Sequence, residues 1–105
     1  MKSSILLVGD KISYIIGYKL IKKGHECNSD DEWLGYVDSV EECAKLCKNK
    51  VGCKYFVNGI RGWEEYCWWE KTLFADCAEG WDEDSYDFYE IVSRKYDLGT
   101  VHRTS

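Results

Sequence analysis

The chain has no proline, only two histidines and no apolar run of about 18 residues, the length that a helix needs to cross a bilayer. We therefore predict no direct membrane span. The net charge of −5 argues against a general nucleic-acid binder, which would need a basic face. No Asn-x-Ser/Thr sequon is present, which excludes N-linked glycosylation within this sequence.

The usual signatures of catalysis are also missing. The two histidines are His25 and His102, and no Gly-x-Ser-x-Gly setting for a nucleophile accompanies them. Cys43 and Cys47 do not have the spacing of thioredoxin-like redox motifs, and no proline supports such a role. We therefore expect no enzymatic activity, no catalytic residue and no cofactor.

Cysteine, by contrast, is abundant for a chain of 105 residues, a length that fits one domain. An even number of cysteines packed into half of a small chain favours a disulfide framework formed in an oxidising compartment, either extracellular or the lumen of an organelle. Six cysteines allow fifteen complete pairings, so spacing alone leaves the connectivity open. The cysteines are Cys27, Cys43, Cys47, Cys53, Cys67 and Cys77.

Two of these cysteines lie in the clearest helix signal of the sequence, residues 40–48. Ser39 and Glu42 form a capping box, in which the Ser39 hydroxyl accepts from the Glu42 amide and the Glu42 carboxylate reaches back. Cys43 and Cys47 are four residues apart and share one helix face, which Val40 extends. Thiols on a buried face can tie the helix to strands beneath it or bind a metal.

Two metal sites can be weighed from the sequence. His25, Glu26 and Cys27, together with the helix thiols, could supply zinc ligands, but the tight Cys-x-x-Cys knuckles of zinc sites are absent. The acidic run 82–87 offers the hard oxygen ligands that Ca²⁺ prefers, but it does not match the EF-hand loop. A solvated acidic turn is the simpler interpretation, so we predict no metal site.

The rest of the chain reads as strands and loops. β-branched and aromatic residues predict strands at 12–22 and 86–92 and a hairpin over 53–70. In the hairpin, Cys67 and Trp69 should face one side and Tyr66 and Trp68 the other. We expect a polar loop over 28–38, an irregular segment over 71–81 and no strong pattern after residue 93.

These motifs resemble the PAN/apple family over residues 18–92, and most of all the PAN-like modules of algal and other protist proteins. The resemblance lies in the two-cysteine helix, in Gly-Cys-Lys-Tyr-Phe at 52–56, in Cys-Trp-Trp-Glu at 67–70 and in Asp-Phe-Tyr-Glu at 87–90. It implies an α+β fold, a small disulfide-rich antiparallel sheet with one helix packed across it. Residues 1–17 would be an N-terminal extension or strand, and residues 93–105 a C-terminal tail.

The resemblance also implies a disulfide pairing. By the family pattern, Cys43 pairs with Cys67, Cys47 with Cys53, and Cys27 with Cys77. The first two pairs would tie the helix to both arms of the hairpin, in agreement with the placement of two thiols on one helix face.

The five tryptophans exceed what a core of this size needs. We expect Trp69 to be buried and Trp63, Trp68 and Trp33 to be candidates for ligand binding, because exposed aromatic rings anchor protein interfaces or stack on sugar rings. PAN/apple modules bind proteins or carbohydrates, so the resemblance implies a non-catalytic interaction module with a protein or glycan partner.

The alternative hypothesis is a structural subunit of a large assembly, such as an extracellular fibril or an organellar membrane complex. In that case the tails, residues 1–17 and 93–105, would dock against neighbouring chains. The first residues resemble a signal peptide, but Asp10 and Lys11 cut the apolar stretch short. We therefore expect the sequence to begin after a removed leader or to be a fragment.

Overall fold

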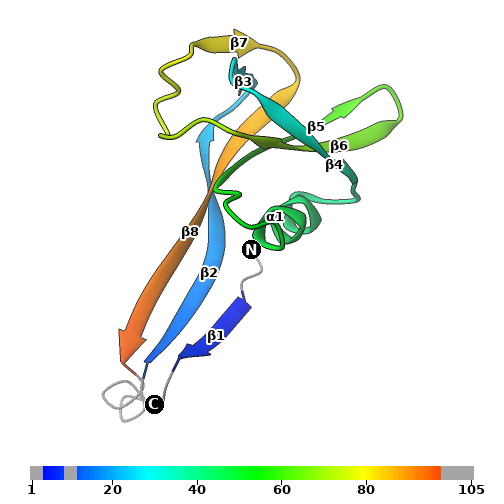
Figure 1. The fold of residues 1–105 in the computed structure, drawn as a ribbon. Coiled ribbons are helices and arrows are strands. Elements are labelled where there is room, and N and C mark those ends of the chain that lie inside the picture. The colour runs from blue at the N-terminus through cyan, green and yellow to red at the C-terminus, as the bar shows by residue number, and fades with distance from the viewer. Residues whose placement is uncertain (1–3, 9–11, 98–105) are drawn as a thin grey trace.

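The computed structural model describes residues 4–8 and 12–97, with side chains placed for residues 16–93. Six strands form an antiparallel sheet in the order β1-β2-β8-β5-β6-β4, and β3 and β7 form a second, two-stranded sheet (Figure 1). The predicted α+β class, with one helix beside an antiparallel sheet, is confirmed for these residues. The elements are β1 Ser4–Val8, β2 Ile12–Lys22, β3 His25–Cys27, β4 Asp31–Tyr36, α1 Val40–Lys48, β5 Tyr55–Arg61, β6 Glu64–Glu70, β7 Trp81–Glu83 and β8 Tyr86–Asp97.

Helix α1 begins and ends where the sequence predicts. Ser39 is the N-cap, and its hydroxyl accepts a hydrogen bond from the Glu42 amide at 3.2 Å. The Glu42 carboxylate, however, accepts from the Asp38 amide at 2.7 Å, so the returning bond reaches one residue further back than a capping box requires. The buried face of the helix consists of Cys43, Ala44 and Cys47.

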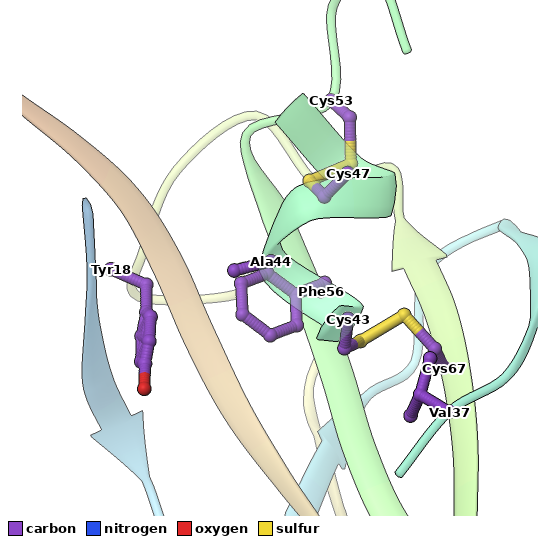
Figure 2. Packing of buried hydrophobic residues seen from close by; sticks show 8 residues of the cluster. All are labelled: Tyr18, Val37, Cys43, Ala44, Cys47, Cys53, Phe56 and Cys67. Atoms are coloured by element: carbon purple, nitrogen blue, oxygen red, sulfur yellow. A yellow bond between two sulfur atoms is a disulfide. The ribbon is translucent and has the colours of Figure 1, made fainter. Parts of the chain in front are cut away.

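All six cysteines form disulfides. Cys43–Cys67 joins α1 to β6, and Cys47–Cys53 joins α1 to the segment that enters β5 (Figure 2). Cys27–Cys77 joins β3 to the loop that precedes β7. These are the pairs that the PAN/apple resemblance implies.

The large sheet is buried on both faces along the first half of β5. Consecutive residues of this strand point to opposite faces, and both faces are covered there. Phe56 points toward α1 and belongs to the first core cluster (Figure 2). Tyr55 and Val57 point away from the helix and belong to the second. The first cluster contains Tyr18, Val37, Cys43, Ala44, Cys47, Cys53, Phe56 and Cys67. The second contains Cys27, Tyr55, Val57, Cys77, Tyr86 and Phe88.

The structure differs from the sequence prediction over residues 28–38. Instead of a polar loop, this segment holds strand β4, which pairs with β6 along its length. The acidic residues at the start of β4 favour a loop in the sequence prediction. Hydrogen bonding to the edge of β6 outweighs this local preference for a loop. The predicted irregular segment 71–81 is irregular only until Trp81, where β7 begins and pairs with β3.

The ends of the described chain also pair more extensively than the sequence indicates. Strand β8 continues past residue 93 to Asp97 and pairs with β2 as far as Ile12. The domain boundaries expected at 17/18 and 92/93 therefore fall inside β2 and β8. Residues 1–3, 9–11 and 98–105 of the predicted tails, including His102, lie outside the described residues. Among the described residues, no helix has the length and apolar character needed to cross a membrane.

The disulfides close loops of very different length. The sequence separations are 50 residues for Cys27–Cys77, 24 for Cys43–Cys67 and 6 for Cys47–Cys53. Loop-closure entropy then assigns them about 4, 3.5 and 2.4 kcal/mol of stability at 25 °C, as upper values. Such contributions rival the whole stability of an ordinary small domain.

Reduction of the native protein is therefore expected to unfold it. Replacing both Cys43 and Cys67 by alanine should cost about 3.5 kcal/mol, more than the cost of about 2.4 kcal/mol for replacing both Cys47 and Cys53. Urea unfolding of the two double variants measures the difference, with the oxidised wild type as the control. A reduced protein that kept the thermal midpoint of the oxidised one would contradict this prediction.

Candidate functional site

Four aromatic side chains from β4 and β6 form one cluster, which we call the aromatic face: Trp33, Tyr36, Tyr66 and Trp68. The strand register places Trp33 opposite Trp68 and Tyr36 opposite Tyr66. The Trp33 ring centroid lies 5.0 Å from those of Tyr36 and Trp68 and 5.4 Å from that of Tyr66. All of these contacts are edge-to-face, an arrangement that aromatic rings favour.

The aromatic face has a fixed base and an exposed rim. Trp68 and Tyr66 are half-buried and pack on the second core cluster. The Trp68 indole Nε1 donates a hydrogen bond to the Tyr86 hydroxyl at 3.1 Å, which fixes the orientation of its ring. Trp33 is 40% exposed and Tyr36 is 61% exposed. The outer two rings therefore offer apolar surface to a ligand, and the inner two hold them in place.

The backbone beneath the aromatic face is held covalently. Cys67 lies between Tyr66 and Trp68 in β6, points to the opposite face and is bonded to Cys43 of α1. The Asn58 side-chain amide donates to the Tyr66 carbonyl at 3.1 Å, which adds a side-chain hydrogen bond to the backbone pairing of β5 and β6. A binding surface on such strands is preorganised, which lowers the entropic cost of binding.

The structure brings together only two of the three tryptophans predicted to bind a ligand. Trp33 and Trp68 are neighbours in the aromatic face. Trp63 lies at the turn between β5 and β6, where it is 99% exposed, and it makes none of the ring contacts found among the described residues. Tyr36 and Tyr66 were not predicted as site residues. Tyr66 could have been found, because the sequence places it on the same face of its strand as Trp68. Tyr36 could not, because the sequence predicts a loop where β4 lies.

A group of carboxylates lies next to the aromatic face, one same-side residue pair further along β4 and β6. Asp31 lies opposite Glu70 in the β4–β6 register, and Glu26 approaches from β3. One carboxylate oxygen from each of the three lies within 4.8 Å of those of the other two. We call Glu26, Asp31 and Glu70 the carboxylate cluster.

Glu70 is the buried member of the carboxylate cluster. It is 1% exposed, and its Oε1 accepts a hydrogen bond from the Ser29 hydroxyl at 2.8 Å. Its Oε2 is buried without a hydrogen-bond partner. Burial raises the Glu70 pKa to about 8, with the nearby charges of Asp31, Glu26 and Asp84 adding to the effect.

The other two members are also affected by their surroundings. Burial, followed by a hydrogen bond with Asp84, raises the Glu26 pKa to about 7. Partial desolvation by neighbouring groups, followed by the charge of Asp30, raises the pKa of the exposed Asp31 carboxyl. Without a cation to neutralise it, Glu70 therefore retains its proton near neutral pH.

The remaining chemical candidates have structural roles. The zinc ligands proposed from Cys27, Cys43 and Cys47 are not available, because these sulfurs are all in disulfides. In the acidic run 82–87, Asp84 accepts from the Tyr86 amide and Asp87 from the Gly24 amide, as expected of an acidic turn.

A groove of about 390 Å³ lies between α1 and β4 and meets the aromatic face at Tyr36. Its wall combines apolar residues with two charged ones of opposite sign, Glu42 and Lys45, which do not form a cluster of acidic or basic groups. The lining residues are Tyr36, Val37, Glu42, Lys45, Leu46 and Asn49.

Comparison of the chain with protein-family models, curated proteins and solved structures found no match. The resemblance to PAN/apple modules therefore stays a prediction made from the cysteine and aromatic pattern.

The raised Glu70 pKa predicts a pH dependence of stability. Between the unfolded pKa of about 4.5 and the folded value of about 8, the folded state holds a proton that the unfolded state has lost. In the presence of a chelator, the free energy of unfolding should therefore fall as pH rises through this window, by up to about 1.4 kcal/mol per pH unit.

Urea unfolding between about pH 5 and pH 8 measures this slope. Glu70→Gln should reduce the slope to the part contributed by Glu26, because an amide does not titrate. Glu64→Gln on the same strand should leave it unchanged. Parallel pH profiles for the wild type and Glu70→Gln would show that Glu70 does not carry the effect.

Proposed function

We propose that the chain is a non-catalytic interaction module that binds carbohydrate through the aromatic face. The observation that carries this proposal is the exposed Trp33 ring, held between Trp68 and Tyr36 on a disulfide-braced strand pair. Pyranose rings present apolar C–H faces that stack on such aromatic rings. Their hydroxyl groups need hydrogen-bond acceptors, and Asp31, an exposed carboxylate two residues before Trp33 on β4, can serve as one.

The non-catalytic assignment is supported by the chemistry of the cysteines. All six are in disulfides, so the chain has no thiol nucleophile. Disulfides of this number persist in oxidising surroundings, which supports an extracellular or lumenal location.

We further propose that the chain is a PAN/apple-type module. Support comes from the arrangement in which one helix is tied by two disulfides to a β-hairpin and a third disulfide closes the domain. In such a module, binding is the function that the fold carries, and the bridges keep the binding surface rigid.

The carbohydrate proposal predicts that Trp33→Ala weakens binding by about tenfold or more, because a central aromatic anchor is lost. A glycan array identifies the sugar class, and titration of tryptophan fluorescence measures the affinity. Tyr36→Ala, which truncates a more exposed ring, should also weaken binding.

The matched control is Trp63→Ala, which removes a fully exposed tryptophan from outside the aromatic face and should leave the affinity unchanged. An equal loss with Trp63→Ala would move the site to the hairpin tip. Absence of binding to any glycan, together with capture of a protein ligand that Trp33→Ala abolishes, would replace carbohydrate by protein as the partner.

A second candidate function is that of a subunit in a larger assembly. The molecule measures 48 × 30 × 23 Å, and its long dimension follows β2 and β8, which run past the helix as an arm (Figure 1). Strand β1, with the sequence Ser-Ile-Leu-Leu-Val, forms one edge of the sheet at this arm. An apolar edge strand is a template for pairing with another chain.

The assembly hypothesis predicts multichain complexes in native mass spectrometry that dissociate on Leu6→Lys, because a charged edge strand resists pairing. Lys19→Glu is a control on the paired strand β2. A wild type that is monomeric at all concentrations in native mass spectrometry would contradict the assembly role.

A further inference from the structure

We propose that Glu26, Asp31 and Glu70 form a binding site for a hard divalent cation of the calcium type. This inference rests on the geometry of the carboxylate cluster and not on sugar binding by the rings. The site draws on three separate elements, because Glu26 lies in β3, Asp31 in β4 and Glu70 in β6.

The spacing of the three carboxylates suits a single ion. Calcium binds oxygen ligands at about 2.3–2.6 Å, so two oxygens on opposite sides of one ion are about 5 Å apart at most. One carboxylate oxygen from each of the three residues lies within 4.8 Å of those of the other two. One ion can therefore contact all three without a change in the backbone.

Glu70 supplies an observation independent of the clustering. Its carboxylate is 1% exposed, and its Oε2 lacks any hydrogen-bond partner. A buried carboxylate is costly unless it is paired, protonated or bound to a metal. None of the ion pairs found among the described side chains involves Glu70, Glu26 or Asp31. A cation is the partner that the free oxygen lacks.

The surroundings orient the ligands and draw in a positive ion. The Ser29 hydroxyl holds Glu70 Oε1 at 2.8 Å, as outer partners of metal ligands commonly do. Asp84 is hydrogen-bonded to Glu26 and adds a fourth acidic group beside the cluster. Arg61 interacts electrostatically with Asp84 and Glu26 and lies over the Tyr86 ring at 5.5 Å.

The exposure of the three ligands gives the ion a path from solvent. Glu70 is buried, Glu26 is half-buried and Asp31 is exposed, so the cluster opens toward Asp31. Water can complete the coordination on that side. Oxygen-only ligands suit calcium rather than zinc. Magnesium is less suited, because it requires near-ideal octahedral geometry and loses its bound water reluctantly.

Binding at this position would fasten the small β3–β7 sheet to the β4–β6 edge of the large one. A ligand that binds only the folded state raises its stability. Calcium should therefore raise the thermal midpoint as well as bind, and both effects should depend on the same three residues.

Calorimetric titration of the intact, oxidised protein with CaCl₂ to about 10 mM covers the affinity range of extracellular calcium modules. Terbium provides a second readout, since Trp33 and Trp68 lie two residues from Asp31 and Glu70 along the strands and can sensitise its emission. We expect saturable binding, a rise in the thermal midpoint, and little response to magnesium at the same concentration.

Glu70→Gln and Asp31→Asn should each weaken calcium binding by about tenfold or more, because each removes one charged ligand. Glu64→Gln, an exposed position on the same strand as Glu70, should bind like the wild type. Asp31 is exposed, so its variant tests the site even if Glu70→Gln alters folding. Absence of saturable binding by the wild type, or wild-type affinity in Asp31→Asn, would overturn the proposal.

Discussion

The Cys43–Cys67 disulfide is the constraint on which the rest of the structure depends. It joins the middle of α1 to the middle of β6, and both cysteines are completely buried (Figure 2). Cys47–Cys53 then limits rotation of the helix, because the two attachments lie one turn apart on the same helix face. Helix, hairpin and core are thereby fixed relative to one another in a domain whose core alone would supply only modest stability.

Strand β6 separates two roles because its side chains alternate. Cys67 points toward the helix and belongs to the first core cluster, and Trp69, which is half-buried and not fully buried as the sequence predicts, packs against that cluster. Tyr66 and Trp68 point away from it and form the base of the aromatic face. Glu70 continues that second side as a buried carboxylate beneath β3. The covalent attachment on one side of the strand thus holds, on the other, the rings and the acid that a ligand or cation would contact.

Much of this arrangement was predictable from the sequence, because the helix cap and the alternation along β6 and β8 are local signals. Strand β4 was not, since acidic residues precede Trp33 and its pairing with β6 is a tertiary effect. The placement of Tyr36 in the aromatic face could not be predicted either, because Tyr36 lies in β4. The burial of Glu70 could not be predicted either, because a glutamate at the end of a strand normally lies in solvent. Its proximity to Glu26 depends on tertiary structure, which no local sequence pattern indicates.

Three specific disulfides hold the helix and the aromatic face on one rigid frame. Mass spectrometry of the intact native protein, followed by peptide mapping without reduction, tests this arrangement most directly. We expect no free thiol and three cross-linked peptide pairs that join Cys27 to Cys77, Cys43 to Cys67 and Cys47 to Cys53. Free thiols in the native protein, or a different connectivity, would contradict it.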